Sequence, residues 1–229
     1  MGLEQIKVEY VEHMGSDLST VNSARVSFDK ESDYCYAGTD LNGKDTYVLI
    51  DKDIELIKYL ADHKHLTPFR HNQIQLRCTA PIFIARQLGK HQAGLSWNEV
   101  SRRYVDAPPE FYMPDEWRAR PEGSVKQGSG GTVESNRKWL YEYDLLVQRV
   151  ESMYEQMLAD GVAPEMARMV MPQSMLTTWI WSGNLLAFAH VYKERIASGA
   201  QLEAQHFAKE LRNVIEPLFP VSFSALIGE

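Results

Sequence analysis

The chain has 229 residues, a length that suits one substantial domain or two small ones. Apolar residues make up 44% of it and charged residues 24%, both ordinary for a globular protein. The net charge of −7, from 24 basic and 31 acidic side chains, disfavours a nucleic-acid-binding module, which usually carries a basic excess. We see no apolar run of membrane-spanning length and no secretory signal. We therefore expect no membrane partner and a cytoplasmic location, in the host cytoplasm if the protein is viral.

The first quarter of the chain predicts a strand followed by two helices. Residues 6–10 alternate between apolar and polar side chains, as a half-buried strand does. Residues 15–17 supply a turn and a helix cap for a small helix over residues 18–28. Residues 29–47 are polar with two glycines and predict an exposed loop. Residues 51–63 repeat apolar side chains at helical spacing and predict an amphipathic helix.

The next segment predicts a strand that runs directly into a helix. Residues 74–80 alternate, and Pro81 suits the first position of a buried helix because its missing N–H costs little there. Gly94 is expected to end that helix. Ser96 would then cap a short second helix, with Glu99 as its capping-box partner. Capping alone remains the alternative role for that pair.

The second half predicts mostly helix. Residues 118–135 are rich in proline and glycine and predict a mobile surface loop. Residues 137–159 have helical apolar spacing, and a short helix is expected to begin at Pro164. Arg168 lies among apolar neighbours, so we expect it to be semi-buried, with an anionic ligand or an internal acidic residue as its partner.

The last part of the chain predicts one more strand and two more helices. Residues 177–183 are β-branched and aromatic, as strands are. Asn184 is expected to cap a helix over residues 185–196, and a final amphipathic helix is expected from Gln201 to about Leu218. We find no internal repeat and no linker, so one domain over residues 1–229 is expected.

Residues 86–103 hold the densest group of polar side chains in the chain, and five of these 18 residues are cationic or potentially cationic. A cluster of cations beside Ser and Asn side chains is what a phosphate-bearing ligand requires. A solvated charged face is the alternative, but Leu95, Trp97 and Tyr104 would bring this segment against a core. The cationic or potentially cationic residues are Arg86, Lys90, His91, Arg102 and Arg103.

The two cysteines, Cys35 and Cys78, have no metal-ligand spacing and do not suggest a disulfide framework. We expect no metal site and a reducing compartment. Cys78 lies on the apolar side of its predicted strand, where a small buried hydrophobe is the common case. Cys35 lies in a polar stretch with Glu31 and Asp33 nearby, so neither cysteine is expected to act as a nucleophile.

The run Ser96-Trp-Asn-Glu-Val-Ser-Arg-Arg-Tyr104 resembles the signature of the flavin-dependent thymidylate synthases (the ThyX family), Ser-x-Asn-Glu-x-Ser-x-Arg-Tyr. Upstream, the family usually has Arg-His-Arg, whereas this chain has Lys90-His91-Gln92 and one extra residue before Ser96. A segment similar to His-x-Thr-Pro-Phe-x-His covers residues 65–71, with Arg70 where the family usually has Glu. The resemblance spans roughly residues 14–28 and 54–226.

The resemblance implies an α+β fold with a mainly antiparallel sheet flanked by helices, and a homotetramer whose subunits share active sites. It implies reductive methylation of dUMP to dTMP, with FAD as cofactor and with methylenetetrahydrofolate and NADPH as co-substrates. Arg195 is implied to be catalytic. The implied dUMP-binding residues are Gln87, Glu99, Ser101, Arg102, Arg103, Arg168 and Arg195. The implied FAD-binding residues are Ser27, Thr67, Lys90, His91, Gln92, Asn98, Glu99, Asn184 and His190.

The reaction chemistry agrees with this set of residues. Attack by uracil C5 on a one-carbon electrophile builds negative charge on the ring, so fixed positive charge must lie near it. Converting a methylene to a methyl group needs a hydride, which no side chain supplies. There is no GxGxxG after a predicted strand, so a Rossmann flavin site is not indicated. A uracil methylase acting on another substrate and a catalytically silent nucleotide-binding homologue remain as alternatives.

Overall fold

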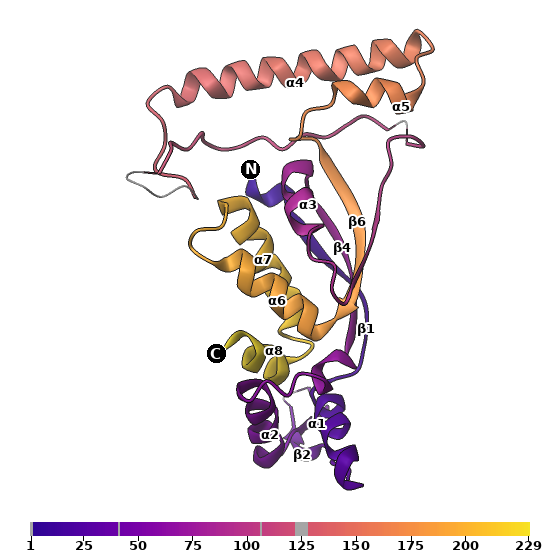
Figure 1. Ribbon diagram of the computed structural model, residues 1–229, viewed down its shortest axis with the longest axis vertical. Helices are drawn as coiled ribbons and strands as arrows, with labels where there is room; N and C mark the ends of the chain where they lie inside the picture. Colours follow the sequence, from indigo (N-terminus) through magenta and orange to yellow (C-terminus); the bar gives the residue numbers. More distant parts are fainter. Residues whose placement is uncertain (1, 41, 106, 122–127) are drawn as a thin grey trace.

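The computed structural model describes residues 2–40, 42–105, 107–121 and 128–229. Its main sheet is antiparallel, with the strand order β1-β4-β6-β5. Helices α3, α6 and α7 lie on one face of this sheet (Figure 1). The strands are β1 (Lys7–Met14), β2 (Cys35–Thr39), β3 (Asp45–Val48), β4 (Gln73–Pro81), β5 (Leu95–Glu99) and β6 (Leu176–Asn184). The helices are α1 (Asp17–Arg25), α2 (Asp51–Asp62), α3 (Ile82–Leu88), α4 (Asn136–Ala159), α5 (Pro164–Ala167), α6 (Leu185–Ile196), α7 (Leu202–Ile215) and α8 (Pro220–Ile227). Short 3₁₀ helices cover Leu3–Gln5, Val26–Phe28, Pro68–Arg70 and Arg168–Val170.

The core lies between the sheet and these helices. Side chains alternate across a strand, so every second residue of β6 is buried on the helix side. Trp179 stacks against Phe207 of α7 with ring centroids 5.9 Å apart, and Trp181 meets Phe188 of α6 edge-on at 5.5 Å. These contacts fix α6 and α7 against the centre of the sheet. The expected α+β fold, with a mainly antiparallel sheet flanked by helices, is confirmed.

Most of the expected elements are present near their expected boundaries. The strands expected at 6–10, 74–80 and 177–183 are β1, β4 and β6, and the helices expected at 51–63, 137–159 and 185–196 are α2, α4 and α6. Ser16 caps α1 through a capping box with Ser19, and the side chain of Asn184 caps α6 by accepting from the N–H of Ala187 at 2.9 Å. Local periodicity and capping therefore sufficed for these elements.

The expectation of a loop over residues 29–47 was wrong. Residues 35–39 and 45–48 pair as two antiparallel strands of a β-hairpin, in which Tyr36 and Tyr47 are cross-strand partners with ring centroids 5.9 Å apart. The hairpin turn is held by the Asp40 carboxylate, which accepts from the N–H of Asn42 and of Lys44. Both strands are largely exposed, so they lack the apolar alternation that identifies a half-buried strand in a sequence.

The segment after β4 also differs from expectation. Helix α3 ends at Leu88 rather than at Gly94, and Pro81 precedes the helix as its N-cap. The expected capped helix at residues 96–99 is instead β5, in which Trp97 stacks on Trp179 at 4.2 Å between ring centroids. That stacking across strands outweighs the local capping pattern.

Two further expectations need correction near the C-terminus. The final helix ends at Ile215, and a separate helix, α8, begins at Pro220. Arg168 is exposed rather than semi-buried, and its Nε donates to the carbonyl oxygen of Glu165 at 3.2 Å. The neighbouring Met166 and Met169 are 52% and 72% exposed, so no apolar enclosure surrounds this arginine among the residues that the structure describes.

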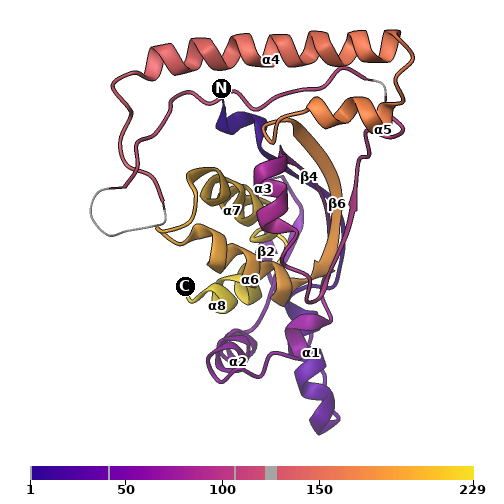
Figure 2. The same cartoon turned by 45° about the horizontal axis from the view of Figure 1, so that its top comes forward.

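Helix α4 lies at one end of the molecule, and α1 and α2 lie at the opposite end (Figure 2). Of the 24 residues of α4, only Val147 and Tyr154 are buried. The mobile loop expected at residues 118–135 falls partly on 122–127, which lie outside the described residues. At the N-terminal end of the expected loop, Arg118 forms an ion pair with the buried Glu203 of α7 at 2.7 Å. No helix in the described part of the chain is long and apolar enough to cross a membrane.

Candidate active site

The best-defined cluster joins α3, the turn after it and the end of α6. The guanidinium of Arg195 donates through Nε and Nη2 to His91 Nε2, at 3.0 and 2.9 Å. Nη2 also donates to the carbonyl oxygen of Gln87 at 3.3 Å. The structure thus brings together three of the residues expected to bind nucleotide or flavin. Their contacts hold the guanidinium in one orientation without neutralising its charge.

The imidazole of His91 must be neutral to accept these bonds. Burial, the positive charge of Arg195 and the proximity of His190 lower the pKa of His91 from 6.5 to about 4. The rings of His91 and His190 meet edge-on with centroids 5.7 Å apart. At neutral pH His91 is therefore an uncharged acceptor between a cationic arginine and a second histidine.

A cavity of about 490 Å³ opens beside Arg195, lined also by Gln87, Glu194 and Gln201. The side chain of Gln87 donates through Nε2 to Gln201 Oε1 at 2.8 Å, which links α3 to the start of α7. Gln201 was not among the expected site residues. Its place at the start of the last predicted helix was the available signal for it.

A second cavity, of about 680 Å³, holds Lys90, His91, Gln92 and Glu99. The carboxylate of Glu99 accepts from Thr177 Oγ1 at 2.7 Å and from Trp97 Nε1 at 3.2 Å. Thr177 and Trp97 thus fix the carboxylate, and sequence reasoning did not anticipate this. The only signal in the sequence was the alternation of side chains in β5 and β6, which places Trp97, Glu99 and Thr177 on the same face of the sheet.

Asn98 lies next to Glu99 in β5 but on the opposite face of the sheet, because successive side chains of a strand alternate. The described chain therefore separates two residues that the sequence placed together at the flavin. Ser101, Arg102 and Arg103, which lie after β5, make mostly local contacts. Arg102 donates to the carbonyl oxygens of Ala107 and Pro108, and Arg103 Nε donates to Ser101 Oγ at 3.3 Å.

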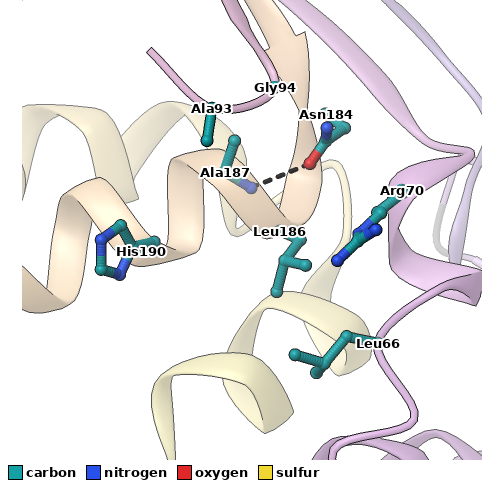
Figure 3. A pocket seen from close by; sticks show the side chains of 8 residues that line it. All are labelled: Leu66, Arg70, Ala93, Gly94, Asn184, Leu186, Ala187 and His190. Carbon is teal, nitrogen blue, oxygen red and sulfur yellow. Dashed lines mark hydrogen bonds between the residues drawn. The ribbon is translucent and has the colours of Figure 1, made fainter. Parts of the chain in front are cut away.

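A third cavity, of about 460 Å³, lies between the start of α6 and the 3₁₀ helix at residues 68–70. Figure 3 shows Asn184, His190 and Arg70 around it, together with Leu66 and Leu186. Gly94 also lines it, in a backbone conformation with φ +76°. This cavity holds two of the expected FAD-binding residues, Asn184 and His190.

The remaining expected residues lie further away. Ser27 and Thr67 line a cavity of about 840 Å³ between α1 and α2. Arg168 follows α5, at the end of the molecule opposite to α1 (Figures 1 and 2). The chain therefore assembles one continuous group around His91. It leaves outside that group the expected residues Ser27, Thr67, Asn98, Ser101, Arg102, Arg103 and Arg168.

These features define an α+β protein whose cavities, lined by cations and amide donors, suit an anionic small molecule. The family model described as thymidylate synthase complementing protein matches residues 9–221. The chain is 34% identical over 222 residues to the flavin-dependent thymidylate synthase of Thermosipho africanus, an overlap that covers 95% of this chain and 89% of that one. It is 31% identical over 218 residues to that of Thermus thermophilus, covering 95% and 74%. The chain belongs to the flavin-dependent thymidylate synthase family.

Solved structures agree with this assignment. The fold matches the UMP/dUMP methylase PolB from Streptomyces cacaoi bound with 5-Br dUMP, with a TM-score of 0.80 and 30% identity over 97% of this chain and 95% of that one. The same enzyme bound with 5-Br UMP gives a TM-score of 0.80 and 27% identity over 97% and 94%.

Proposed function

We propose that this protein methylates dUMP to dTMP, with methylenetetrahydrofolate as the carbon donor, FAD as cofactor and NADPH as the reductant of the flavin. Family membership over residues 9–221, together with the guanidinium of Arg195 held by His91 and Gln87, carries the proposal. The methylase neighbour that binds uracil-nucleotide analogues supports the choice of acceptor.

Arg195 has the central role in this proposal. Negative charge develops on the pyrimidine ring as C5 attacks, and a cation already in place stabilises it without reorganisation. Because its bonded partners are a neutral imidazole and a carbonyl oxygen, Arg195 keeps its full positive charge. Gln87, fixed by Gln201, would contact the nucleotide from the same cavity.

The other substrate residues would bind and orient the nucleotide. Glu99, held by Thr177 and Trp97, offers an acceptor in a fixed position. Arg103 and Arg168 are exposed and make only local contacts, so they are available as phosphate donors. Ser101 and Arg102 would act mainly by shaping the segment that carries Arg103.

The residues present fit a flavin nucleotide. Lys90, His91 and Gln92 line one cavity and Asn184 and His190 line the next, and the edge-on contact of the two histidines connects them. Together they offer a cation, amides and imidazoles for phosphates and ring heteroatoms. Bound FAD, once reduced, would supply the hydride that turns the transferred methylene into a methyl group.

A homotetramer with shared sites is part of the proposal. Ser27 and Thr67 lie at one end of the molecule and Arg168 lies at the other, so one chain does not bring them to the same active site. Contributions from neighbouring subunits would bring such residues together. The exposed apolar side chains of α4 offer a surface for such contacts.

Purified protein tests the proposal directly. We expect a yellow protein that releases FAD, and dTMP formation only when dUMP, methylenetetrahydrofolate and NADPH are all present. A colourless protein that binds dUMP without turnover would identify a catalytically silent nucleotide-binding homologue instead.

A uracil methylase acting on UMP is the second candidate, because the matched structure is described as a UMP/dUMP methylase and was solved with analogues of both nucleotides. Parallel assays with UMP and dUMP separate the two functions through the ratio of kcat/KM.

A further inference from the structure

The cavity between α6 and residues 66–70 contains a cation that nothing within the described chain neutralises. Arg70 is exposed, and its guanidinium points toward Leu186 in Figure 3. No carboxylate is among the residues that line this cavity. In the described part of the chain, the Arg70 guanidinium has neither an ion pair nor a hydrogen bond. Its five donors are therefore free for a ligand.

The other polar groups of the cavity are also suited to an anion. The side-chain oxygen of Asn184 already accepts from the N–H of Ala187, which leaves the Nδ2 amide group to donate. His190 supplies a ring N–H in either tautomer. The remaining surface is apolar, formed by Leu66, Leu186 and small side chains. The cavity thus combines a charged fork and two further donors with an apolar wall.

We propose that Arg70 binds the phosphate groups of the flavin dinucleotide, in the same cavity as Asn184 and His190. This inference rests on the proposed function, because it presupposes that FAD is the cofactor. An arginine fork matches phosphate oxygens in a bidentate manner, and it makes a larger contribution where no carboxylate competes. FAD offers both flat rings for the apolar wall and phosphates for the donors.

Flavin titrations with and without phosphate groups test the inference. Affinities for FAD and for riboflavin, which lacks phosphates, are measured by fluorescence quenching for wild type, Arg70→Ala and Arg70→Gln. We expect both variants to bind FAD about 10- to 100-fold more weakly, as the loss of a charge-assisted hydrogen bond predicts. Riboflavin affinity should change less than about twofold, because the phosphates carry the effect. A higher salt concentration should reduce the difference in FAD affinity between wild type and the two variants.

Lys58→Ala is the matched control. It removes the same single positive charge from an exposed position of the neighbouring helix α2, outside the residues that line either nearby cavity. Its FAD affinity should equal that of wild type. The Arg70 side chain makes no hydrogen bond or ion pair in the described chain and is exposed, so both Arg70 variants should fold, and thermal melts check this.

Three results would overturn the inference alone, and a fourth would overturn it together with the proposed function. Unchanged FAD affinity in both Arg70 variants would remove Arg70 from the cofactor site. An equal loss for riboflavin would assign it to ring packing instead of phosphate binding. Weaker methylenetetrahydrofolate binding with normal FAD affinity would assign it to the folate carboxylates. If wild type binds no FAD at all, the proposed function fails together with this inference, whereas the other results leave the proposed function intact.

Discussion

Among single residues, a substitution of Arg195 should separate the methylation of dUMP from the reduction of FAD by NADPH. Arg195→Ala should lower dTMP formation by roughly 10²- to 10³-fold, because it removes the preorganised charge at the pyrimidine. Reduction of FAD by NADPH should persist, since the proposed flavin residues Asn184 and His190 line a different cavity and His91 loses only its bonds from Arg195. Product assays and anaerobic bleaching of the flavin measure the two steps. Equal loss of both would assign Arg195 to the flavin.

The pKa of His91 gives a pH dependence of defined sign. Its folded-state value of about 4 lies below its ordinary value of 6.5. Between these values the unfolded chain binds more protons than the folded one, so stability falls as the pH is lowered through this window. His91→Gln keeps an acceptor for Arg195 but cannot titrate. Urea unfolding midpoints of the variant should decline less steeply from pH 6.5 to pH 4, and parallel curves would refute this assignment.

The two cysteines should be dispensable for catalysis. Cys78 is fully buried in β4, where burial raises the pKa of its thiol, and Cys35 lies on an exposed hairpin strand. The double variant Cys35→Ala, Cys78→Ala should still make dTMP. It should lose roughly 1 kcal/mol of stability from the smaller core side chain. Activity is measured on folded, FAD-loaded protein. Loss of dTMP with intact NADPH oxidation would restore a cysteine nucleophile.

At the scale of elements, the turn between α3 and β5 depends on a glycine. Gly94 has φ +76°, and a Cβ there would lie 2.4 Å from Nδ2 of Asn184, the residue that caps α6. Gly94→Ala should therefore destabilise the protein by roughly 2–3 kcal/mol, from backbone strain of about 1 kcal/mol and the displaced cap. Gly43→Ala is the matched control. Gly43 has φ +79° with nothing within 4 Å of the added Cβ, so only the strain should remain.

Denaturant unfolding of both glycine variants measures the difference. Equal losses at Gly94 and Gly43 would mean that the Asn184 cap yields without cost. A larger loss of stability at Gly94, accompanied by weaker FAD binding, would connect the turn to the cavity that Gly94 and Asn184 line.

The elements also show what a sequence can and cannot reveal. The strands β4 and β6 and helix α6 follow from local periodicity, and the family resemblance implied that Gln87 and Arg195 bind the nucleotide and that His91 binds the flavin. The strand β5 could not be found this way, because its Ser-x-x-Glu spacing satisfies a helix-capping pattern equally well. What decides its structure is the stacking of Trp97 on Trp179, a contact between residues distant in sequence.

For the molecule as a whole, the exposed apolar side chains of α4 predict that the protein forms an oligomer. Its exposed apolar residues include Trp139, Leu145, Leu146 and Met153, which are between 42% and 52% exposed. Light scattering should show a tetramer in solution. Leu146→Glu should shift it toward smaller species, because it places a charge on a surface that would be buried.

Gln148→Glu is the control for the α4 prediction. It adds the same charge two residues further on, on the opposite side of the helix. Its oligomeric state should match that of wild type. A wild-type monomer that holds stoichiometric FAD would contradict both the tetramer and the sharing of sites between subunits.

The strand order has a consequence for synthesis of the chain. The strand β6 pairs with both β4 and β5, yet it lies far after them in sequence, with α4 and α5 in between. A nascent chain that has not yet reached Leu176 carries β4 and β5 with no partner between them, and the tryptophans of the core are still to come. Long-range pairing of this kind makes folding slow. The emerging chain therefore exposes unpaired strand edges during translation, the interval in which a chaperone would have most to protect.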